Sequence, residues 1–229
     1  MAGSVRQIIE VPCTVEALER SEALSQLAPE ALTALGAESI DGDALGVEAA
    51  ARVDAAIEAC LAAYDPRGVY KLFNPAICTL PPEYSEPAIK LVGTMMMFHG
   101  QSVYERLRRA AHCALMAVTI GPDNPAALPA DADELDRALA DACARALVES
   151  AADHVNAAIV AAAMEEGLYT DDRLSPGMGD FPLDTRSQFV FYTQSEKRLG
   201  LKLGKDGVFE PRYSCLLYTS PSPRDGATS

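Results

Sequence analysis

The stretch from Asp133 to Glu166 constrains the fold most, because it predicts one long, uninterrupted helix. At about 1.5 Å per residue, such a helix is on the order of 50 Å long. Gly167 stands where a C-terminal cap is expected. The many alanines of the stretch allow neighbouring elements to approach it closely. Its predicted buried stripe consists of apolar residues at helical spacing: Leu135, Leu139, Cys143, Leu147, Val155 and Ile159.

Charged residues recur every four positions along one side of this predicted helix. They are Asp141, Arg145, Glu149 and Asp153. Residues four apart are neighbours on a helix surface, so the ordinary interpretation is a solvated ladder of ion pairs, each worth about 0.3–0.5 kcal/mol.

Shorter elements are expected on both sides of the long helix. The continuous apolar run 113–120, closed by Gly121 and Pro122, predicts a central strand that is covered on both faces. Thr185 to Gln188 fits a capping box that would open a helix running to Leu199. Residues 1–12 are expected to be a loose or weakly extended start to a helical N-terminal arm over 1–30. Further helices are predicted over 14–20, 24–35, 46–64 and 102–109, strands over 69–73, 77–80 and 89–94, and a β-hairpin over 201–209.

Composition and charge narrow the class of protein. The chain has 229 residues, enough for one domain with a substantial core, which we place at 1–214. Its formal charge of −14 disfavours binding to nucleic acid or to an anionic membrane, since both attract basic surfaces. The chain contains no run of about 18 apolar residues, so no transmembrane helix is expected. The N-terminus lacks the apolar core of a signal peptide, so we expect a cytoplasmic protein.

The reactive side chains form no recognisable catalytic or metal-binding motif. None of the six cysteines forms a Cys-x-x-Cys pair, so buried free thiols are expected rather than a disulfide framework or a zinc site. The three histidines lie beside no nucleophile motif. The stretch 95–98 is interpreted as packed core or the end of a strand rather than as a patch that contacts a corrin. The sequence therefore predicts no catalytic side chain and no metal site.

The segment from Arg173 to Leu183 has no plausible regular secondary structure. Pro176 fixes its own φ and pushes Ser175 away from helical conformation. Gly177 and Gly179 permit positive φ and leave the backbone open to the close approach of another molecule. Arg173 is the only cation of the segment, and a guanidinium offers a planar fork of donors suited to a carboxylate. A plain connecting turn with a solvated arginine is the open alternative.

This segment resembles the Arg-x-x-Pro-Gly-Tyr signature of the activation domain of cobalamin-dependent methionine synthase. It is closer to the stand-alone relatives of that domain, which tend to read Arg-x-Ser-Pro-Gly-Tyr-Gly-Asp-x-Pro-Leu. The chain departs from both at Met178, where the family usually has tyrosine near the ligand. In the family this loop helps to bind S-adenosylmethionine, and its arginine meets the ligand carboxylate. The resemblance implies that the loop residues form a ligand site: Arg173, Ser175, Pro176, Gly177, Met178 and Gly179. It also implies an acidic group that faces the sulfonium or amino group of the ligand, and Asp141 and Glu149 of the long helix are the candidates for it.

The resemblance also implies a fold and a function. The expected fold class is α+β, with a mostly antiparallel sheet flanked by long helices. The expected function is that of a reactivation subunit, which binds S-adenosylmethionine and docks on a cobalamin-binding methionine synthase or a related corrinoid protein. Cobalamin would be supplied by that partner, because the chain lacks the Asp-x-His-x-x-Gly signature, and a flavodoxin-like protein would supply an electron. The alternative hypothesis, motivated by Met178, is a non-catalytic binding or assembly module that has lost the ligand.

The C-terminal stretch 215–229 differs from everything before it. Its first part, Cys215 to Asp225, back-translates without interruption to a sequence resembling a transposase-based sequencing-library adapter. A serine- and proline-rich linker is the ordinary interpretation of such composition. We interpret the stretch instead as an adapter artefact that packs against nothing, which would leave the domain cut short and its last hairpin without a partner strand.

Overall fold

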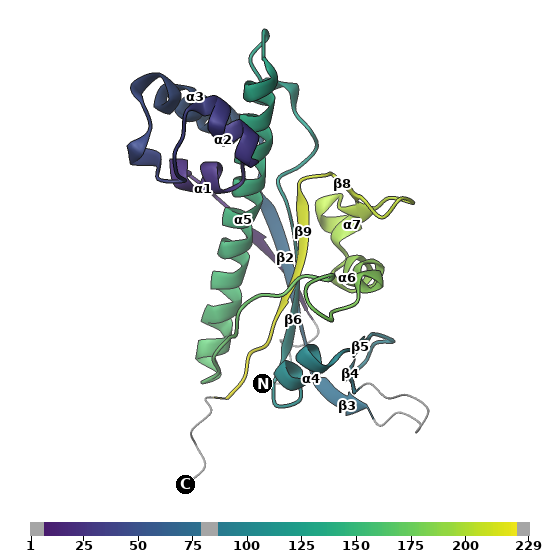
Figure 1. Cartoon of the computed structure of the whole chain (residues 1–229). Coiled ribbons are helices and arrows are strands. Elements are labelled where there is room, and N and C mark those ends of the chain that lie inside the picture. The colour runs from purple at the N-terminus through teal and green to yellow at the C-terminus, as the bar shows by residue number, and fades with distance from the viewer. Residues whose placement is uncertain (1–6, 79–86, 224–229) are drawn as a thin grey trace.

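The computed structural model describes residues 7–78 and 87–223, and its centre is a four-stranded antiparallel sheet (Figure 1). The strands are β1 (Ile8–Pro12), β2 (Arg67–Phe73), β6 (Cys113–Thr119) and β9 (Ser214–Thr219), in the order β1-β2-β6-β9. All seven residues of β6 are buried, as the continuous apolar run predicted. The predicted α+β class, with antiparallel sheets and helices, is confirmed.

The long helix α5 (Glu134–Glu165) runs along one face of this sheet and extends beyond it (Figure 1). Its C-terminal end follows the predicted glycine signal, and its N-terminal end is capped by Asp133. The Asp133 carboxylate accepts a hydrogen bond of 2.8 Å from the amide of Asp136, and Gly167 has the left-handed φ of 72° that favours glycine. Above the sheet, α5 packs against α1 (Arg20–Ser25), α2 (Pro29–Leu35) and α3 (Val47–Ala63), which together form a second apolar core.

The N-terminal region differs from its prediction in two ways. Residues 8–12 form a strand and not part of a helical arm, because they pair with β2 along its open edge. Residues 14–19 are irregular rather than helical. Helix α1 begins at Arg20, and just before it the amide of Glu19 donates a hydrogen bond of 2.7 Å to the carboxylate of Glu22. The predicted helix over 24–35 is two helices, since Pro29 starts α2 at a position where its missing N–H costs nothing.

Two short helices, α6 (Arg186–Thr193) and α7 (Ser195–Leu199), cover the other face of the sheet. The prediction of a single helix that begins at a capping box over 185–188 and runs to Leu199 is wrong. The Thr185 hydroxyl donates to the carbonyl of Pro182 at 2.7 Å and does not cap the helix, and Gln194 has a φ of 53°, which interrupts the helix. The buried aromatic residues of the core on this side include Phe73, Phe98, Phe181, Phe189 and Tyr218.

The remaining strands form two small sheets. One contains β3 (Pro75–Cys78), β4 (Ala88–Leu91) and β5 (Met97–His99), followed by helix α4 (Gln101–Leu107). The other is the hairpin of β7 (Lys202–Leu203) and β8 (Phe209–Glu210), which confirms the prediction for 201–209. Met96 and Phe98 are buried, so the core interpretation of the stretch 95–98 is confirmed for these two residues, but it is wrong for Met95, which is 84% exposed. The predicted strand over 77–80 extends outside the described residues.

The prediction that residues 215–229 pack against nothing is wrong for the part that the structure describes. Residues 214–219 form β9, which pairs with the central strand β6 from Ser214 opposite Thr119 to Thr219 opposite Ala114. Leu216 and Tyr218 are each 1% exposed. The physical reason is that β6 has an open edge whose backbone groups need partners, and the alternating side chains at 216 and 218 fill the core beneath it. The adapter origin stays a prediction that sequencing the gene from source DNA would test, and 224–229 lie outside the described residues.

Candidate functional site

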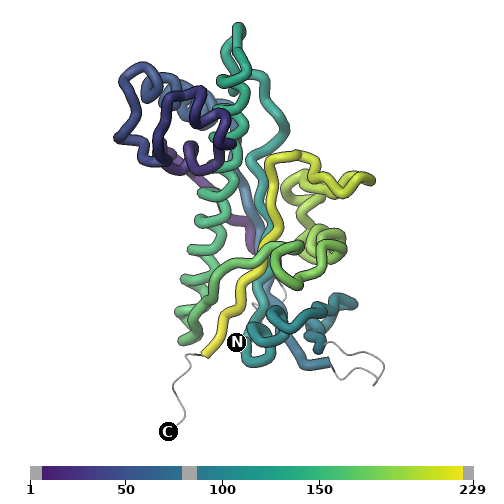
Figure 2. The backbone as a smooth tube through the Cα atoms, viewed as in Figure 1, coloured from purple at the N-terminus to yellow at the C-terminus, as the bar shows by residue number. Residues whose placement is uncertain are grey.

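The loop after α5 crosses the chain's last strand before it reaches α6 (Figure 2). Leu174 and Tyr218 exchange backbone hydrogen bonds of 3.0 and 2.8 Å across this crossing. A second bridge joins Tyr169 to Ser222. Strand β9 therefore fixes the position of the residues on either side of Arg173.

The segment 175–181 is a tight, closed turn. The amide of Met178 donates to the carbonyl of Ser175 at 3.0 Å, and the amide of Gly177 donates to the carbonyl of Phe181 at 2.9 Å. Gly177 has a φ of 98°, and a Cβ there would lie 2.8 Å from Cδ1 of Leu183. Both conditions favour glycine, but the space beside it is occupied by the Leu183 side chain, so the role of Gly177 as an opening for another molecule stays a prediction. Phe181 anchors the turn, since its ring is buried among aromatic side chains.

Asp180 ties the turn to helix α4. Its carboxylate accepts hydrogen bonds from the hydroxyl of Ser102 and, at 3.0 Å, from the amide of Ser102. These two bonds, the hydroxyl contributing most, lower the pKa of Asp180 below its ordinary value. Arg106 of the same helix donates to the carbonyl of Asp172 at 3.0 Å. The loop is thus held on one side by β9 and on the other by α4.

Arg173 points at the long helix. Its Nη2 lies 2.7 Å from Oδ1 of Asp153 and 3.9 Å from Oε2 of Glu149. The arginine side chain is only 21% exposed, while the Glu149 and Asp153 side chains are 58% and 66% exposed. The other terminal nitrogen, Nη1, is buried and has no hydrogen-bond partner within the described part of the chain. A buried guanidinium nitrogen without a partner is costly, and an acceptor oxygen beside it would remove that cost.

The structure separates the two acidic candidates of the long helix. Glu149 lies beside Arg173, whereas Asp141 accepts hydrogen bonds from Arg145, from Arg212 and, at 2.8 Å, from the hydroxyl of Tyr213. Twelve positions of helix at about 1.5 Å each put Asp141 about 18 Å from Asp153 along the axis. Asp141 therefore belongs to a different cluster, in which burial and the Asp141 carboxylate raise the pKa of Tyr213.

Asp153 was not predicted to be a site residue. It belongs to the series of charges at four-residue spacing, but that spacing does not show which member of the series the loop approaches. Beneath this cluster, burial raises the pKa of Cys215 to about 12, with a further contribution from the Glu149 carboxylate, so the thiol is neutral at pH 7.

The remaining predicted site residues lie along the turn. Ser175 is partly buried, Pro176 is buried, and Gly177 and Gly179 are exposed. Met178 is 50% exposed, and its sulfur accepts a contact of 3.4 Å from the amide of Ser175. The sulfur thus turns back onto the loop, while part of the side chain faces solvent.

Neither a metal site built from His, Cys, Asp or Glu side chains nor a membrane-spanning helix is found in the described residues. Within residues 7–78 and 87–223, no three His, Cys, Asp or Glu side chains come together in a way that could hold a metal ion. Over the same residues, no helix combines the length and the apolar character needed to cross a membrane.

Comparisons with known proteins were made by sequence and by structure. No family model and no curated protein matches the chain. Among solved structures, the chain is similar to the crystal structure of the MetH reactivation domain bound to AdoHcy, with a TM-score of 0.63 and 18% sequence identity. The match covers 97% of this chain and 81% of that chain. The chain therefore shares the α+β fold of the MetH reactivation domain.

Proposed function

We propose that the chain is an S-adenosylmethionine-binding subunit for the reductive reactivation of a cobalamin-dependent methionine synthase or a related corrinoid protein. The observation that carries this proposal is Nη1 of Arg173, a buried guanidinium nitrogen that has no partner among residues 7–78 and 87–223, in a loop of the form Arg-x-Ser-Pro-Gly. Support also comes from the fold, which is similar to a reactivation domain bound to AdoHcy.

The residues around Arg173 fit the amino-acid end of such a ligand. The ligand carboxylate would accept from Nη1, while Asp153 keeps its place on Nη2 at 2.7 Å. Glu149 is 3.9 Å from Nη2 and largely exposed, so its carboxylate is free to accept from the ligand's ammonium group. The exposed backbone of Gly177 and Gly179 would line the rest of the pocket. In this arrangement the chain binds and orients the ligand and contributes no catalytic side chain.

The reactive chemistry belongs to the cofactors. Cobalamin carried by the partner, once reduced by one electron from an external flavodoxin-like donor, would accept the methyl group of the sulfonium, leaving S-adenosylhomocysteine. The task of this chain is to hold the sulfonium methyl toward the partner's corrin. We place this activity in the cytoplasm.

The direct test is methyl transfer. The chain is mixed with a methionine synthase that lacks its own activation domain and carries inactive cob(II)alamin, together with a chemical reductant and S-adenosylmethionine labelled in the methyl group. We expect label to appear in the protein-bound corrinoid only when the chain is present. Transfer at the same rate without the chain would overturn the proposal.

A matched pair of substitutions tests the assignment of the acidic group. Glu149→Gln is expected to weaken S-adenosylmethionine binding by about five- to tenfold, because it removes an exposed charge from the ligand's ammonium group. Asp141→Asn, on the same helix but in the Tyr213 cluster, is expected to leave affinity unchanged. Isothermal titration of both variants measures the difference, and equal effects would remove Glu149 from the site.

A second candidate function is a binding or assembly module that does not take the ligand. Met178 favours it, because its sulfur contacts the amide of Ser175 at 3.4 Å where the resembling family has a phenol. This candidate predicts docking on the corrinoid protein without any heat of binding for S-adenosylmethionine.

A further inference from the structure

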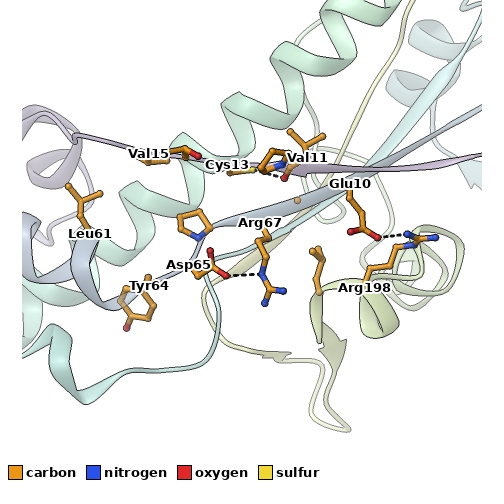
Figure 3. Close-up of a pocket in the computed structure, with 14 residues that line it drawn as sticks. Glu10, Val11, Cys13, Val15, Leu61, Tyr64, Asp65, Arg67 and Arg198 are labelled. Carbon is orange, nitrogen blue, oxygen red and sulfur yellow. Dashed lines mark hydrogen bonds and ion pairs between the residues drawn. The ribbon is translucent and has the colours of Figure 1, made fainter.

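The six cysteine thiols of the chain lie in different surroundings. Cys13 at the β1 edge donates to the carbonyl of Val11 at 3.4 Å (Figure 3), and burial raises its pKa to about 11. Burial also raises the pKa of four further thiols, which are Cys60, Cys113, Cys143 and Cys215. Buried thiols of this kind are neutral at pH 7 and are poor metal ligands. Cys78, in contrast, is the last residue of β3 and is partly exposed, so an ion in solvent can reach it.

Cys78 and Met97 bring two sulfur atoms together on the small sheet of β3, β4 and β5 (Figure 1). Sγ of Cys78 lies 3.8 Å from Sδ of Met97 on β5, and both side chains are partly exposed. Sulfur ligands about 2.3 Å from one tetrahedral metal ion lie about 3.8 Å from each other. The two sulfur atoms therefore have the separation that two ligands of one ion require.

The strand register places His99 on the same face of this sheet as the two sulfur residues. Cys78 and His99 are both paired with Ala88 of β4, one on each side of it. Directly paired residues of an antiparallel sheet share a face, and so do alternate residues of one strand, such as Met97 and His99. The intervening Phe98 belongs to the other face, where it is buried in the core. A thiol, a thioether and an imidazole thus share one face, around the short side chain of Ala88.

The ring of His99 is available as a ligand. It is partly exposed and makes no hydrogen bond or ion pair with any residue that the structure describes. The other two histidines are bonded: Nε2 of His112 lies 3.0 Å from Oε2 of Glu166, and Nδ1 of His154 lies 2.9 Å from the carbonyl oxygen of Ser150. Neutral imidazole is the commonest metal ligand in proteins, so His99 can turn a nitrogen toward an ion without losing another partner.

The chemistry of these side chains selects the ion. A thioether is a soft ligand that suits Cu(I), whereas zinc sites use thiolate, imidazole and carboxylate, and magnesium and calcium sites use oxygen. The nearby charge favours the same ion. Lys90 is exposed on this face and is paired with Met97 in the register. A monovalent ion neutralises the Cys78 thiolate, while a divalent ion would leave a positive charge near the Lys90 ammonium group.

We propose that Cys78, Met97 and His99 form a binding site for Cu(I). On binding, the Cys78 thiol releases its proton to solvent and the thiolate forms the Cu–S bond. Sδ of Met97 and a ring nitrogen of His99 donate lone pairs, and the oxidation state of copper does not change. Local motifs in the sequence predicted no metal site, because Cys78 and Met97 are 19 positions apart and meet through the pairing of β3 and β5 with β4.

The test is an anaerobic titration of the full chain with Cu(I) in competition with the chromophoric chelator bicinchoninic acid. We expect the chain to withdraw one equivalent of Cu(I), and X-ray absorption of the loaded chain to show sulfur ligands at about 2.3 Å. Zn(II) should bind at least about tenfold more weakly. Failure to withdraw Cu(I), or a copper environment without sulfur, overturns the proposal. Zn(II) binding of equal strength also overturns it, because the thioether would then have no role.

Single substitutions place the ion at these three residues. Cys78→Ser, Met97→Leu and His99→Gln are each expected to weaken Cu(I) binding at least about tenfold. Two matched controls should bind as the unaltered chain does: Met95→Leu, at a methionine that is 84% exposed in the adjoining turn, and His154→Gln on α5. Thermal melts without copper check that each variant is folded. Unchanged affinity in any of the three ligand variants overturns the assignment.

The copper site is independent of the proposed function. Arg173→Ala should leave Cu(I) affinity unchanged, and Met97→Leu should leave S-adenosylmethionine affinity unchanged. Loss of Cu(I) binding in Arg173→Ala would contradict a site confined to the small sheet.

Discussion

Replacing Leu216 with alanine is expected to lower the free energy of unfolding by about 2–5 kcal/mol, the range for removing a buried leucine side chain. Leu216 is 1% exposed and lies on β9 opposite Ala117 of the central strand. Its side chain belongs to the core that contains Phe98 and Phe181, where few atoms can move to fill a cavity. Equilibrium unfolding in urea measures the change.

Tyr218→Phe is the matched control on the same strand. The Tyr218 ring packs 5.1 Å from Phe181 and 5.8 Å from Phe98 between ring centroids, but its hydroxyl is buried and has no hydrogen-bond partner in the described chain. Removing that hydroxyl should leave stability unchanged or raise it by about 1 kcal/mol. If Leu216→Ala costs less than about 1 kcal/mol, β9 does not pack as the structure shows, and the segment is independent of the fold.

Replacing Arg173 with alanine is expected to weaken S-adenosylmethionine binding by about 2–5 kcal/mol, which is about 30- to 4,000-fold in affinity. A charge-assisted hydrogen bond from Nη1 holds the ligand carboxylate strongly, and truncation leaves the ligand's charge unpaired in a partly buried site. Arg173→Lys should recover only part of the loss, because a single ammonium group cannot reproduce the fixed spacing by which Nη2 holds Asp153 while Nη1 faces the ligand carboxylate. Isothermal titration of each variant provides the affinities.

The fold of the Arg173→Ala variant should survive. Glu149 and Asp153 lose their arginine partner in this variant, but their side chains are mostly exposed and remain solvated. The free energy of unfolding should therefore change by less than about 1 kcal/mol. Arg145→Ala is the control on helix α5, because Arg145 pairs with Asp141 at the surface. Its loss should change stability by less than about 1 kcal/mol and should leave the affinity for S-adenosylmethionine unchanged. Unchanged ligand binding in Arg173→Ala would remove the central residue from the site. A collapsed melting temperature would show instead that the arginine is structural.

Local signals in the sequence determined the long elements. The apolar stripe and the glycine at 167 determined α5, because a helix of this length repeats its signal many times. The continuous apolar run determined that β6 is a central strand. The proline and glycines after Arg173 determined that a turn interrupts regular structure there, since they restrict or free φ regardless of what surrounds them.

Only the tertiary structure decided which distant groups meet. Composition described residues 215–223 as a linker, but the open edge of β6 offers unpaired backbone groups, and a segment with apolar side chains at alternate positions satisfies them as β9. The four charges at equal spacing on α5 could not be told apart from the sequence. Contacts with β9 and α4 fix where the loop passes the helix, so Arg173 lies beside Asp153 and Glu149, while Asp141 bonds to Tyr213. Spacing along a chain determines which face of a helix a side chain shares, whereas its partner depends on long-range packing that no local pattern encodes.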